Sequence, residues 1–357
     1  MRVDWGMPSC HVLLSADDRT GALEIGGLIA NEQFTVPVGP NAQSERLCVV
    51  DITTRHVSRE AAQQSMVELL RRNATHRAHK MDAGLRGNWP FEIEVLLEAG
   101  HKVAVVCSFP DADRRCKDGV VYIHDLPVLE SVFGQDPLNA PVSSRPADVL
   151  EHAGVSGDVV VWDADDNEQL HAAIERAAAE TRVVVGASGA LGAFAQTLYP
   201  TLQPRRVPLP HPRRVVCGSL NPLSREQIER TGHPIQLVGG RLDLIDDPAI
   251  IATPLPGGDI GEAEALAMAV KVAKDIRAVW SNIGTLIVIG GDTVGAIVGE
   301  DTLEVIGTVA PGIPASLYDG VCLITKGGGI GQLDVIRDLL QRSRQDAHPD
   351  FETGTST

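Results

Sequence analysis

The chain has 357 residues, of which 43% are hydrophobic, and carries a formal net charge of −16 at pH 7. This length can bury a core for two domains, and the negative charge argues against nucleic acid or an anionic membrane as partner, because both require a concentrated basic face. With no apolar run long enough to span a bilayer and no secretory signal at its start, the chain is expected in a bacterial-type cytoplasm.

The first predicted strand leads into a pair of acids. The apolar run at 11–15 predicts a short buried strand, and the sequence A-D-D-R-T-G-A that follows it opens a helix. In open α/β sheets ligands bind at the carboxyl ends of strands, where a helix N-terminus also offers amide N–H groups to an anion. Asp17 and Asp18 therefore mark a candidate site, although either acid taken alone is also explained as a helix cap.

Short apolar runs that end in small or polar residues recur along the chain and predict buried parallel strands. They lie at 47–51, 102–107, 158–163, 182–186, 214–217, 286–289 and 321–325. Helical patterns lie between several of them, at 58–72, 167–180, 261–282 and 332–342. This alternation predicts an α/β fold with two domains, each a largely parallel sheet flanked by helices.

Five prolines between Pro200 and Pro212 predict a linker at 201–213, because they can continue neither a helix nor a central strand. We therefore expect a first domain at 10–200 and a second at 214–342. The polar tail at 343–357 has no periodicity and is expected to be disordered.

The six cysteines form no C-x-x-C pair, and several lie in or beside apolar runs. Buried free thiols explain this pattern better than disulfides or a zinc site.

Basic residues follow the later strands of the first half. Arg55 can bind a carboxylate with both arms of its guanidinium, although an ion pair with a neighbouring acid explains it equally well. Lys80, Asp82 and Arg86 stand among glycines ahead of a predicted helix, which suits a pocket for a polyhydroxylated anion better than a helix surface. A third basic group, Arg114 or Arg115, lies in a loop predicted at 108–119, again directly after a strand.

Three glycine-rich turns follow strands of the second half: C-G-S at 217–219, G-G-D-T at 290–293 and K-G-G-G-I-G at 326–331. The last is predicted to lead directly into a helix at Gln332. Backbone amides of such a turn can bind phosphate, and Lys326 can add positive charge. The spacing fits neither a Walker A loop nor a dinucleotide fingerprint. One such turn is equally explained as a tight connection, but three at one sheet edge favour a phosphate site.

Taken in order, these motifs resemble the four-carbon acid sugar kinase family, from about residue 12 to residue 340. The blocks are A-D-D-R-T-G-A, T-T-R, K-M-D-A-G-L-R-G-N, F-P-D-A-D-R, V-G-A-S-G, C-G-S, G-G-D-T, P-G-I-P and K-G-G-G-I-G. The resemblance implies an N-terminal sugar-binding domain, a C-terminal nucleotide-binding domain and an active site in the cleft between them. It also implies phosphorylation of a sugar acid at its terminal hydroxyl by ATP, with Mg²⁺ held mainly by the ATP phosphates and water.

The chemistry of the residues and the resemblance together suggest roles for individual residues, and no protein side chain is assigned as a metal ligand. The catalytic candidates are Asp18 and Asp82, either of which can orient and deprotonate the acceptor hydroxyl. The substrate-binding candidates are Asp17, Arg19, Thr20, Arg55, Lys80, Arg86 and Arg114. Among them Arg55, Lys80 and Arg86 are expected to hold the carboxylate and hydroxyls. The nucleotide-binding candidates are Gly218, Ser219, Gly290, Gly291, Asp292, Thr293, Lys326, Gly328, Gly329 and Gly331.

The chain departs from the family pattern in three places. Asp82-Ala83-Gly84 replaces D-S-T, Lys326-Gly327-Gly328 replaces K-S-G, and Arg19 replaces a residue that is typically apolar. The first change removes two hydroxyls, which alters the substrate oxygens that can be satisfied and leaves the exact sugar acid open.

Two other functions stay open. A non-catalytic sensor of sugar acid and nucleotide on the same fold would transfer no phosphate. A hydroxy-acid dehydrogenase is disfavoured, because no strand ends in the nicotinamide glycine fingerprint. The expected partners are the sugar acid and ATP, and a homo-oligomer is compatible with the sequence.

Overall fold

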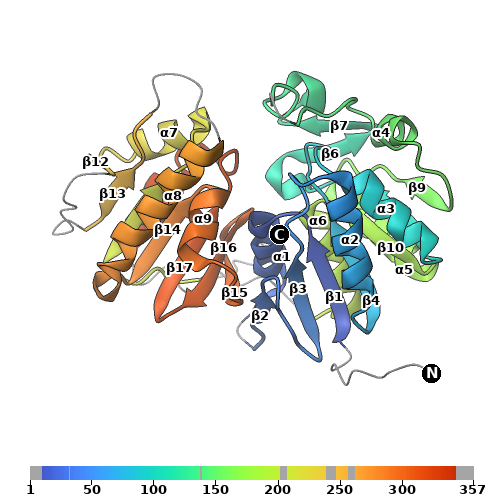
Figure 1. Ribbon diagram of the computed structural model, residues 1–357, viewed down its shortest axis with the longest axis horizontal. Coiled ribbons are helices and arrows are strands. Elements are labelled where there is room, and N and C mark those ends of the chain that lie inside the picture. The colour runs from blue at the N-terminus through green and yellow to red at the C-terminus, as the bar shows by residue number, and fades with distance from the viewer. Residues whose placement is uncertain are drawn as a thin grey trace, which may run out of the picture. The chain divides into compact units, whose positions relative to one another are not determined.

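The structure, a computed structural model, describes residues 10–31, 33–136, 139–201, 207–238, 247–255 and 262–342. The chain divides into two compact units, which Figure 1 draws mainly in blue to green and mainly in yellow to red, with residues 300–307 of unit 1 in orange. Unit 1 comprises residues 1–204 and 300–307, and unit 2 comprises residues 205–299 and 308–357. The predicted α/β class is confirmed, because helices flank a mostly parallel sheet.

The sheet of unit 1 has the strand order β15-β2-β3-β1-β4-β10-β5-β9. Its strands are β1 (Cys10–Ala16), β2 (Val36–Val38), β3 (Leu47–Asp51), β4 (Ala74–Lys80), β5 (Lys102–Val106), β9 (Val159–Val161), β10 (Arg182–Gly186) and the first part, 303–307, of β15 (Leu303–Ala310). Parallel pairing of β1 with both β3 and β4 places β1 between them. At one edge, 303–305 pair with β2 in the antiparallel sense.

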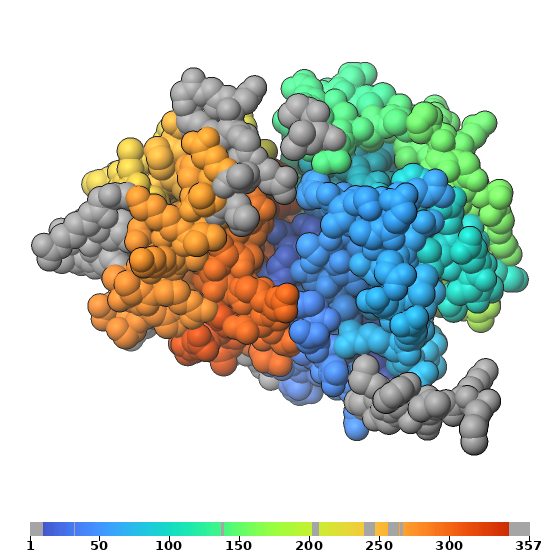
Figure 2. Space-filling view, viewed as in Figure 1, coloured from blue at the N-terminus to red at the C-terminus, as the bar shows by residue number. Residues whose placement is uncertain are grey.

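Helices cover both faces of this sheet. They are α1 (Arg19–Ile29), α2 (Arg59–Leu70), α3 (Trp89–Glu98), α4 (Pro146–Ala153), α5 (Asn167–Ala179) and α6 (Ser188–Leu198). Helix α6 packs against α1 and α5, while α2 packs against α3. Figure 2 shows the side chains of α2 and α3 covering the face of unit 1 turned toward the viewer. Beneath them Met66, Trp89 and Ile93 join Leu13 and Val50 in a buried apolar core.

A three-stranded antiparallel sheet follows β5 and the short turn η1 (Pro110–Ala112). It contains β6 (Arg114–Lys117), β7 (Val120–Ile123) and β8 (Leu126–Pro127), and the turn η2 (Val128–Glu130) follows it. The prediction of a loop throughout 108–119 is therefore wrong for β6. The polar sequence of β6 concealed a strand whose pairing comes from β7 across the turn at Asp118 and Gly119.

The sheet of unit 2 includes the strand order β12-β13-β11-β14-β17-β16. These strands are β11 (Arg213–Cys217), β12 (Ile235–Leu237), β13 (Ala249–Ala252), β14 (Thr285–Ile289), β16 (Ile313–Tyr318) and β17 (Val321–Lys326). The helices are α7 (Pro222–Glu229), α8 (Glu262–Arg277), α9 (Gly291–Val298) and α10 (Val335–Gln341), with the turn η3 (Trp280–Asn282) after α8. β11 and β14 are parallel neighbours, and β14 is also parallel to β17, so that their carboxyl ends share one edge.

The division of the chain differs from the sequence-based boundaries in two respects, one of which is that the predicted linker is divided between the units at 204/205 and ends in β11, which begins at Arg213. The predicted second domain at 214–342 includes Glu300–Gly307, which the structure groups with unit 1. The predicted linker at 201–213 includes 202–206, and the predicted tail is 343–357; both of these segments lie outside the described residues. The return of 300–307 to unit 1 depends on long-range strand pairing, for which the local sequence carries no signal.

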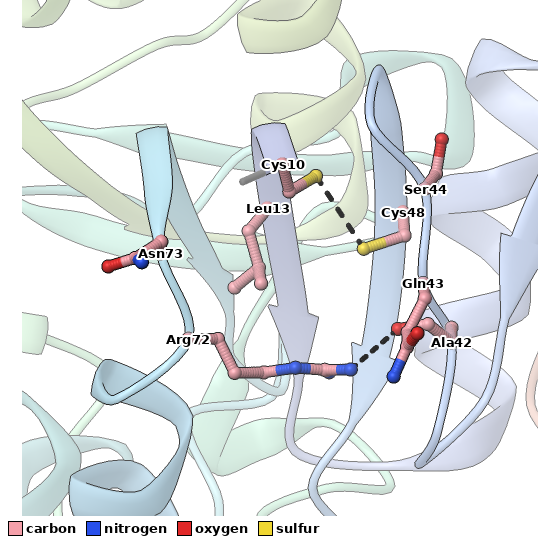
Figure 3. Close-up of a pocket in the computed structure, with 8 residues that line it drawn as sticks. All are labelled: Cys10, Leu13, Ala42, Gln43, Ser44, Cys48, Arg72 and Asn73. Atoms are coloured by element: carbon pink, nitrogen blue, oxygen red, sulfur yellow. Dashed lines mark hydrogen bonds between the residues drawn. The ribbon is translucent and has the colours of Figure 1, made fainter. Parts of the chain in front are cut away.

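All six cysteines are buried and free, as predicted. Cys10 and Cys48 have their sulfur atoms 3.7 Å apart in a small pocket, where Arg72 donates a 2.8 Å hydrogen bond to the carbonyl oxygen of Ala42 (Figure 3). Cys10 begins β1, so this pocket lies toward the amino end of that strand. It is therefore distinct from the strand end that carries Asp17 and Asp18.

Candidate active site

The carboxyl ends of β1, β3 and β4 bring two acids and two basic residues together. Asp17 and Asp18 directly follow β1, Arg55 follows β3, and Lys80 ends β4. Arg55 donates through Nε to Asp17 Oδ2 at 2.7 Å, and through Nη2 to Asp17 Oδ1 at 2.9 Å and Asp18 Oδ1 at 2.6 Å. Lys80 Nζ lies 3.0 Å from Asp17 Oδ1 and 2.9 Å from Asp18 Oδ1. The predicted convergence of these four residues is thus present.

Asp18 is the more accessible acid of this pair. Its side chain is 24% exposed, against 2% for Asp17. The hydrogen bonds from Arg55, Lys80 and the Gly21 amide all end on Oδ1, and no described residue donates to Oδ2. Burial acts to raise the pKa of Asp18, but the charges of Arg55 and Lys80 outweigh it and hold the pKa well below its usual range. Asp18 therefore presents one ionised oxygen for a further hydrogen bond.

Asp82 has both carboxylate oxygens engaged. Arg86 donates to Oδ2 through Nε at 2.7 Å and to Oδ1 through Nη2 at 3.2 Å, and the Gly84 amide also donates to Oδ2. Burial acts to raise the pKa of Asp82, while Arg55 and Arg86 lower it well below its usual range. Arg86 also donates to Asp136 at 2.7 Å. Asp82 is ionised, but its oxygens are committed to the chain's own donors.

Gly21 permits the close approach on which the acid pair depends. A Cβ atom at this position would lie 2.3 Å from Cε of Lys80 and 2.5 Å from Oδ1 of Asp18. Even an alanine would thus displace the ammonium or the carboxylate. The glycine of the D-D-R-T-G motif is explained by this packing.

A buried hydrogen-bonded chain supports the strand ends. Ser15 Oγ and His79 Nδ1 lie 2.9 Å apart, His79 Nε2 and Glu92 Oε2 lie 2.8 Å apart, and the Thr54 hydroxyl donates to Glu92. All four side chains are buried. They join β1, β4, α3 and the segment after β3. In the sequence, His79 directly precedes Lys80 and Thr54 directly precedes Arg55. The sequence analysis included Thr54 in the T-T-R motif but missed Ser15, His79 and Glu92, for which the only signal was a polar side chain within a buried strand or helix face.

The remaining sugar-domain candidates lie elsewhere in unit 1. Arg19 is buried at the start of α1, donates to the carbonyl oxygen of Asp301, and has Nη1 4.0 Å from Asp51 Oδ2. Thr20 follows it in the first turn and is partly buried. Arg114 begins β6 and is buried. The bonds of Arg19 join α1 to the returning 300–307 segment, which is a structural role that the sequence did not suggest.

Unit 2 contains a pocket of about 280 Å³ at the carboxyl ends of β11 and β14. Its lining includes seven of the predicted nucleotide-binding residues: Gly218, Ser219, Gly290, Gly291, Asp292, Thr293 and Gly328. The sequence missed the other lining residues: Leu220, Thr253, Met268 and Ala269. Helix α9 begins in this lining, and its N-cap, Gly290, supplies no side-chain hydrogen bond. The first amides of α9 are therefore available to an anion.

Close packing of the three turns explains two of the glycines. A Cβ atom on Gly218 would lie 1.9 Å from Oγ1 of Thr293, and one on Gly328 would lie 2.6 Å from Oγ of Ser219. Arg225 braces this arrangement, because its Nε donates to the carbonyl oxygen of Ser219 at 2.7 Å. The walls of the pocket are thus fixed by contacts within unit 2.

Lys326 faces the carbonyls of its own glycine turn. It is fully buried, and its Nζ donates to the carbonyl oxygens of Gly327 at 2.9 Å and Gly328 at 3.4 Å. Lys326, Gly329 and Gly331 are not among the lining residues of the pocket. The predicted helix start at Gln332 is wrong, since α10 begins at Val335, after Gly331 at φ +84°. The helix N-terminus at this pocket is that of α9.

Replacement of Lys326 by methionine is expected to change how stability depends on pH. Burial lowers the pKa of Lys326 from 10.5 to about 7. Between these values the unfolded chain binds more protons than the folded one, so the free energy of unfolding rises with pH. Between roughly pH 7 and pH 9, the unfolding free energy of wild type should rise by about 2 kcal/mol relative to that of Lys326→Met. Urea titrations at both pH values measure it, and a constant difference would exclude the lowered pKa.

No group of three or more His, Cys, Asp or Glu side chains in the described parts of the chain could hold a metal ion. Among the helices described, none has the length and apolar character needed to cross a bilayer.

Comparison with known proteins is consistent with this geometry. Residues 12–186 match the family model described as "Sugar-binding N-terminal domain". The chain is 26% identical to the D-threonate kinase of Bordetella bronchiseptica over 409 aligned positions, which cover 94% of this chain and 98% of that protein. It is 28% identical to the D-erythronate kinase of Heliobacterium modesticaldum over 155 positions, which cover 39% of this chain but only 35% of the relative.

A solved structure extends the likeness to most of the chain. The crystal structure of a Haemophilus influenzae protein of the DUF1537 family matches with a TM-score of 0.65 at 19% identity, covering 92% of this chain and 99% of that one. At this identity the match shows a shared fold.

Proposed function

Because the chain belongs to the four-carbon acid sugar kinase family, we propose that it transfers the γ-phosphoryl group of ATP to the terminal hydroxyl of a four-carbon, or closely related, sugar acid. The relatives named as D-threonate and D-erythronate kinases make these two acids the first candidates. The proposed location is the cytoplasm, where ATP is available.

The observation that carries the proposal is the unengaged oxygen of Asp18. Its Oδ2 can accept a hydrogen bond from the acceptor hydroxyl, while Arg55 and Lys80 fix Oδ1. Phosphoryl transfer depends mainly on positioning and charge stabilisation, because its transition state is loose. An acid with a strongly lowered pKa suits this task, since it orients the hydroxyl and accepts the proton late. We therefore assign Asp18, and not Asp82, to the acceptor hydroxyl.

The pocket of unit 2 is the proposed nucleotide site. Uncapped amides at the start of α9 and the glycine turns at 218 and 290 suit phosphate groups, which need backbone N–H donors at close range. Asp292 is the acid that lines this pocket, so it is the candidate ligand for Mg²⁺, directly or through water. When bound, Mg²⁺ would neutralise charge on the phosphates.

Release of ADP in the presence of a panel of four-carbon and branched sugar acids tests the proposal. We expect release that depends on the acid, with D-threonate and D-erythronate assayed first and reactions without acid as the control. Binding of ATP and of an acid without transfer would instead support the sensor. A change in nicotinamide absorbance with a hydroxy acid would support the dehydrogenase.

A further inference from the structure

The basic residues of the Asp17–Asp18 cluster are already balanced by acids. Arg55, Lys80 and Arg86 each form an ion pair with at least one of the carboxylates nearby. Those carboxylates are Asp17, Asp18, Asp82 and Asp136. Three cations thus face four anions, and a substrate carboxylate placed among them would add a fifth. The proposed function therefore requires a counter-ion for the sugar acid outside this set.

Arg114 is a buried cation that lacks such a partner. The residue is 6% exposed, and its guanidinium forms neither a hydrogen bond nor an ion pair with any described residue. Its Nε is fully buried and unsatisfied. A buried charge without a partner is costly, which points to an anion that completes the site.

The start of β6 lies against the N-terminus of α6. Phe109 and Arg114 exchange backbone hydrogen bonds of 2.8 Å and 3.2 Å. A Cβ atom on Gly189 would lie 2.8 Å from Cα of Phe109, so the first turn of α6 contacts Phe109, the backbone partner of Arg114. Ala187, the N-cap of α6, offers no side-chain oxygen to the first amides of the helix. The uncapped amides and Arg114 therefore belong to one neighbourhood.

Glu24 connects this neighbourhood to the acid cluster. The Ser188 hydroxyl donates to Glu24 Oε2 at 2.5 Å, while Oε1 of Glu24 is buried and has no partner. Burial raises the pKa of Glu24, and the charges of Arg114 and Lys80 only partly oppose this. These charge interactions place Glu24 within electrostatic reach of both Arg114 and Lys80. A raised pKa favours the neutral carboxylic acid, which donates a hydrogen bond and does not repel an anion.

We propose that Arg114, together with the Ser188 end of α6 and Glu24, binds the carboxylate of the sugar acid. This inference rests on the proposed function and adds to it the group that distinguishes a sugar acid from a neutral polyol. Asp18 then contacts the acceptor hydroxyl at the opposite end of the substrate, and the balanced cluster around Asp18 needs no extra counter-ion.

The test compares a sugar acid with the four-carbon polyol that lacks the carboxylate. Arg114→Gln should lower kcat/KM for the acid by at least about tenfold, mainly through KM, because charge-assisted hydrogen bonds are lost. Turnover of the polyol should be unchanged. Arg115→Gln is the matched control, since Arg115 is the next residue of β6 and pairs at the surface with Asp125 and Asp165. It should leave both substrates unaffected, and Arg114→Lys should restore part of the preference for the acid.

Two outcomes would overturn the inference. One is an equal loss for acid and polyol in Arg114→Gln, which would indicate a structural role. The other is an unchanged KM for the acid. Calorimetry of the acid with the full chain, without ATP, separates this inference from the proposed reaction. If wild type binds the acid and Arg114→Gln does not, the carboxylate site stands even where no phosphate is transferred. If wild type binds no sugar acid, both proposals fail.

Discussion

Asp18→Asn is expected to lower the rate of phosphoryl transfer by about 10²- to 10⁴-fold, the range typical of a lost general base. Asparagine keeps the size of the side chain but removes the negative charge that Arg55 and Lys80 surround. The carboxylate oxygen that would accept the proton is replaced by an amide group, which is a far weaker base. Single-turnover measurements with saturating ATP and sugar acid isolate this step from binding and product release.

Asp82→Asn is the matched control for this prediction. Asp82 gives both oxygens to the donors of Arg86 and to the Gly84 amide, so its replacement should mainly lower the thermal unfolding midpoint. Its single-turnover rate should stay within roughly tenfold of wild type. A fully active Asp18→Asn beside an inactive Asp82→Asn would reverse the assignment. Normal transfer by both variants would exclude either acid as the base.

Gly218→Ala is expected to weaken ATP binding by roughly tenfold to a hundredfold, because overpacking of this kind costs about 1–3 kcal/mol. The new methyl group would start 1.9 Å from Oγ1 of Thr293, which is buried in the first turn of α9. The turn and the helix must separate to admit it, and the amides of α9 then move relative to the pocket. Calorimetric titration with ATP measures the loss, and affinity for the sugar acid should be unchanged.

Gly295→Ala makes the same substitution within α9, the helix that contains Thr293, without the close contact. No heavy atom lies within 4 Å of a Cβ atom at this position, and alanine favours the helix. ATP affinity should therefore equal that of wild type. If Gly218→Ala also binds ATP normally, the pocket of unit 2 is not the nucleotide site.

The convergence of the acid cluster was predictable because it follows from topology. Strands that run parallel end at one edge, so residues that follow the predicted strands β1 and β3 meet there whatever their side chains. The strand that Lys80 ends, β4, was not predicted, because its sequence A-T-H-R-A-H-K is mostly polar. The pairing within the cluster was not predictable. Whether Arg55 binds a substrate or Asp17 depends on distances of a few ångströms, which spacing along the chain does not encode. The sequence assigned Arg55, Lys80 and Arg86 to the substrate, and the structure pairs all three with the chain's own carboxylates.

The glycine turns illustrate the same limit in unit 2. Their meeting at one pocket was predicted, and Gly218, Gly290 and Gly328 line it. The direction of the Lys326 side chain was not predictable, since a lysine beside glycines can bind a phosphate or a set of carbonyl oxygens equally well. Residues such as Met268 and Thr253 reach the pocket from other elements and carry no local motif.

The assignment of 300–307 to unit 1 bears on how the protein is made. A ribosome delivers β2 long before Leu303–Val305, the segment that pairs with it, and most of unit 2 is translated in between. Until then the nascent sheet has an unpaired edge at β2. This strand has only three residues, one of them Pro37, so it is a poor template for pairing with other strands. Complete folding of unit 1 thus depends on synthesis of most of unit 2. In a chain that stalls before residue 303, the edge at β2 would stay unpaired and available to chaperones.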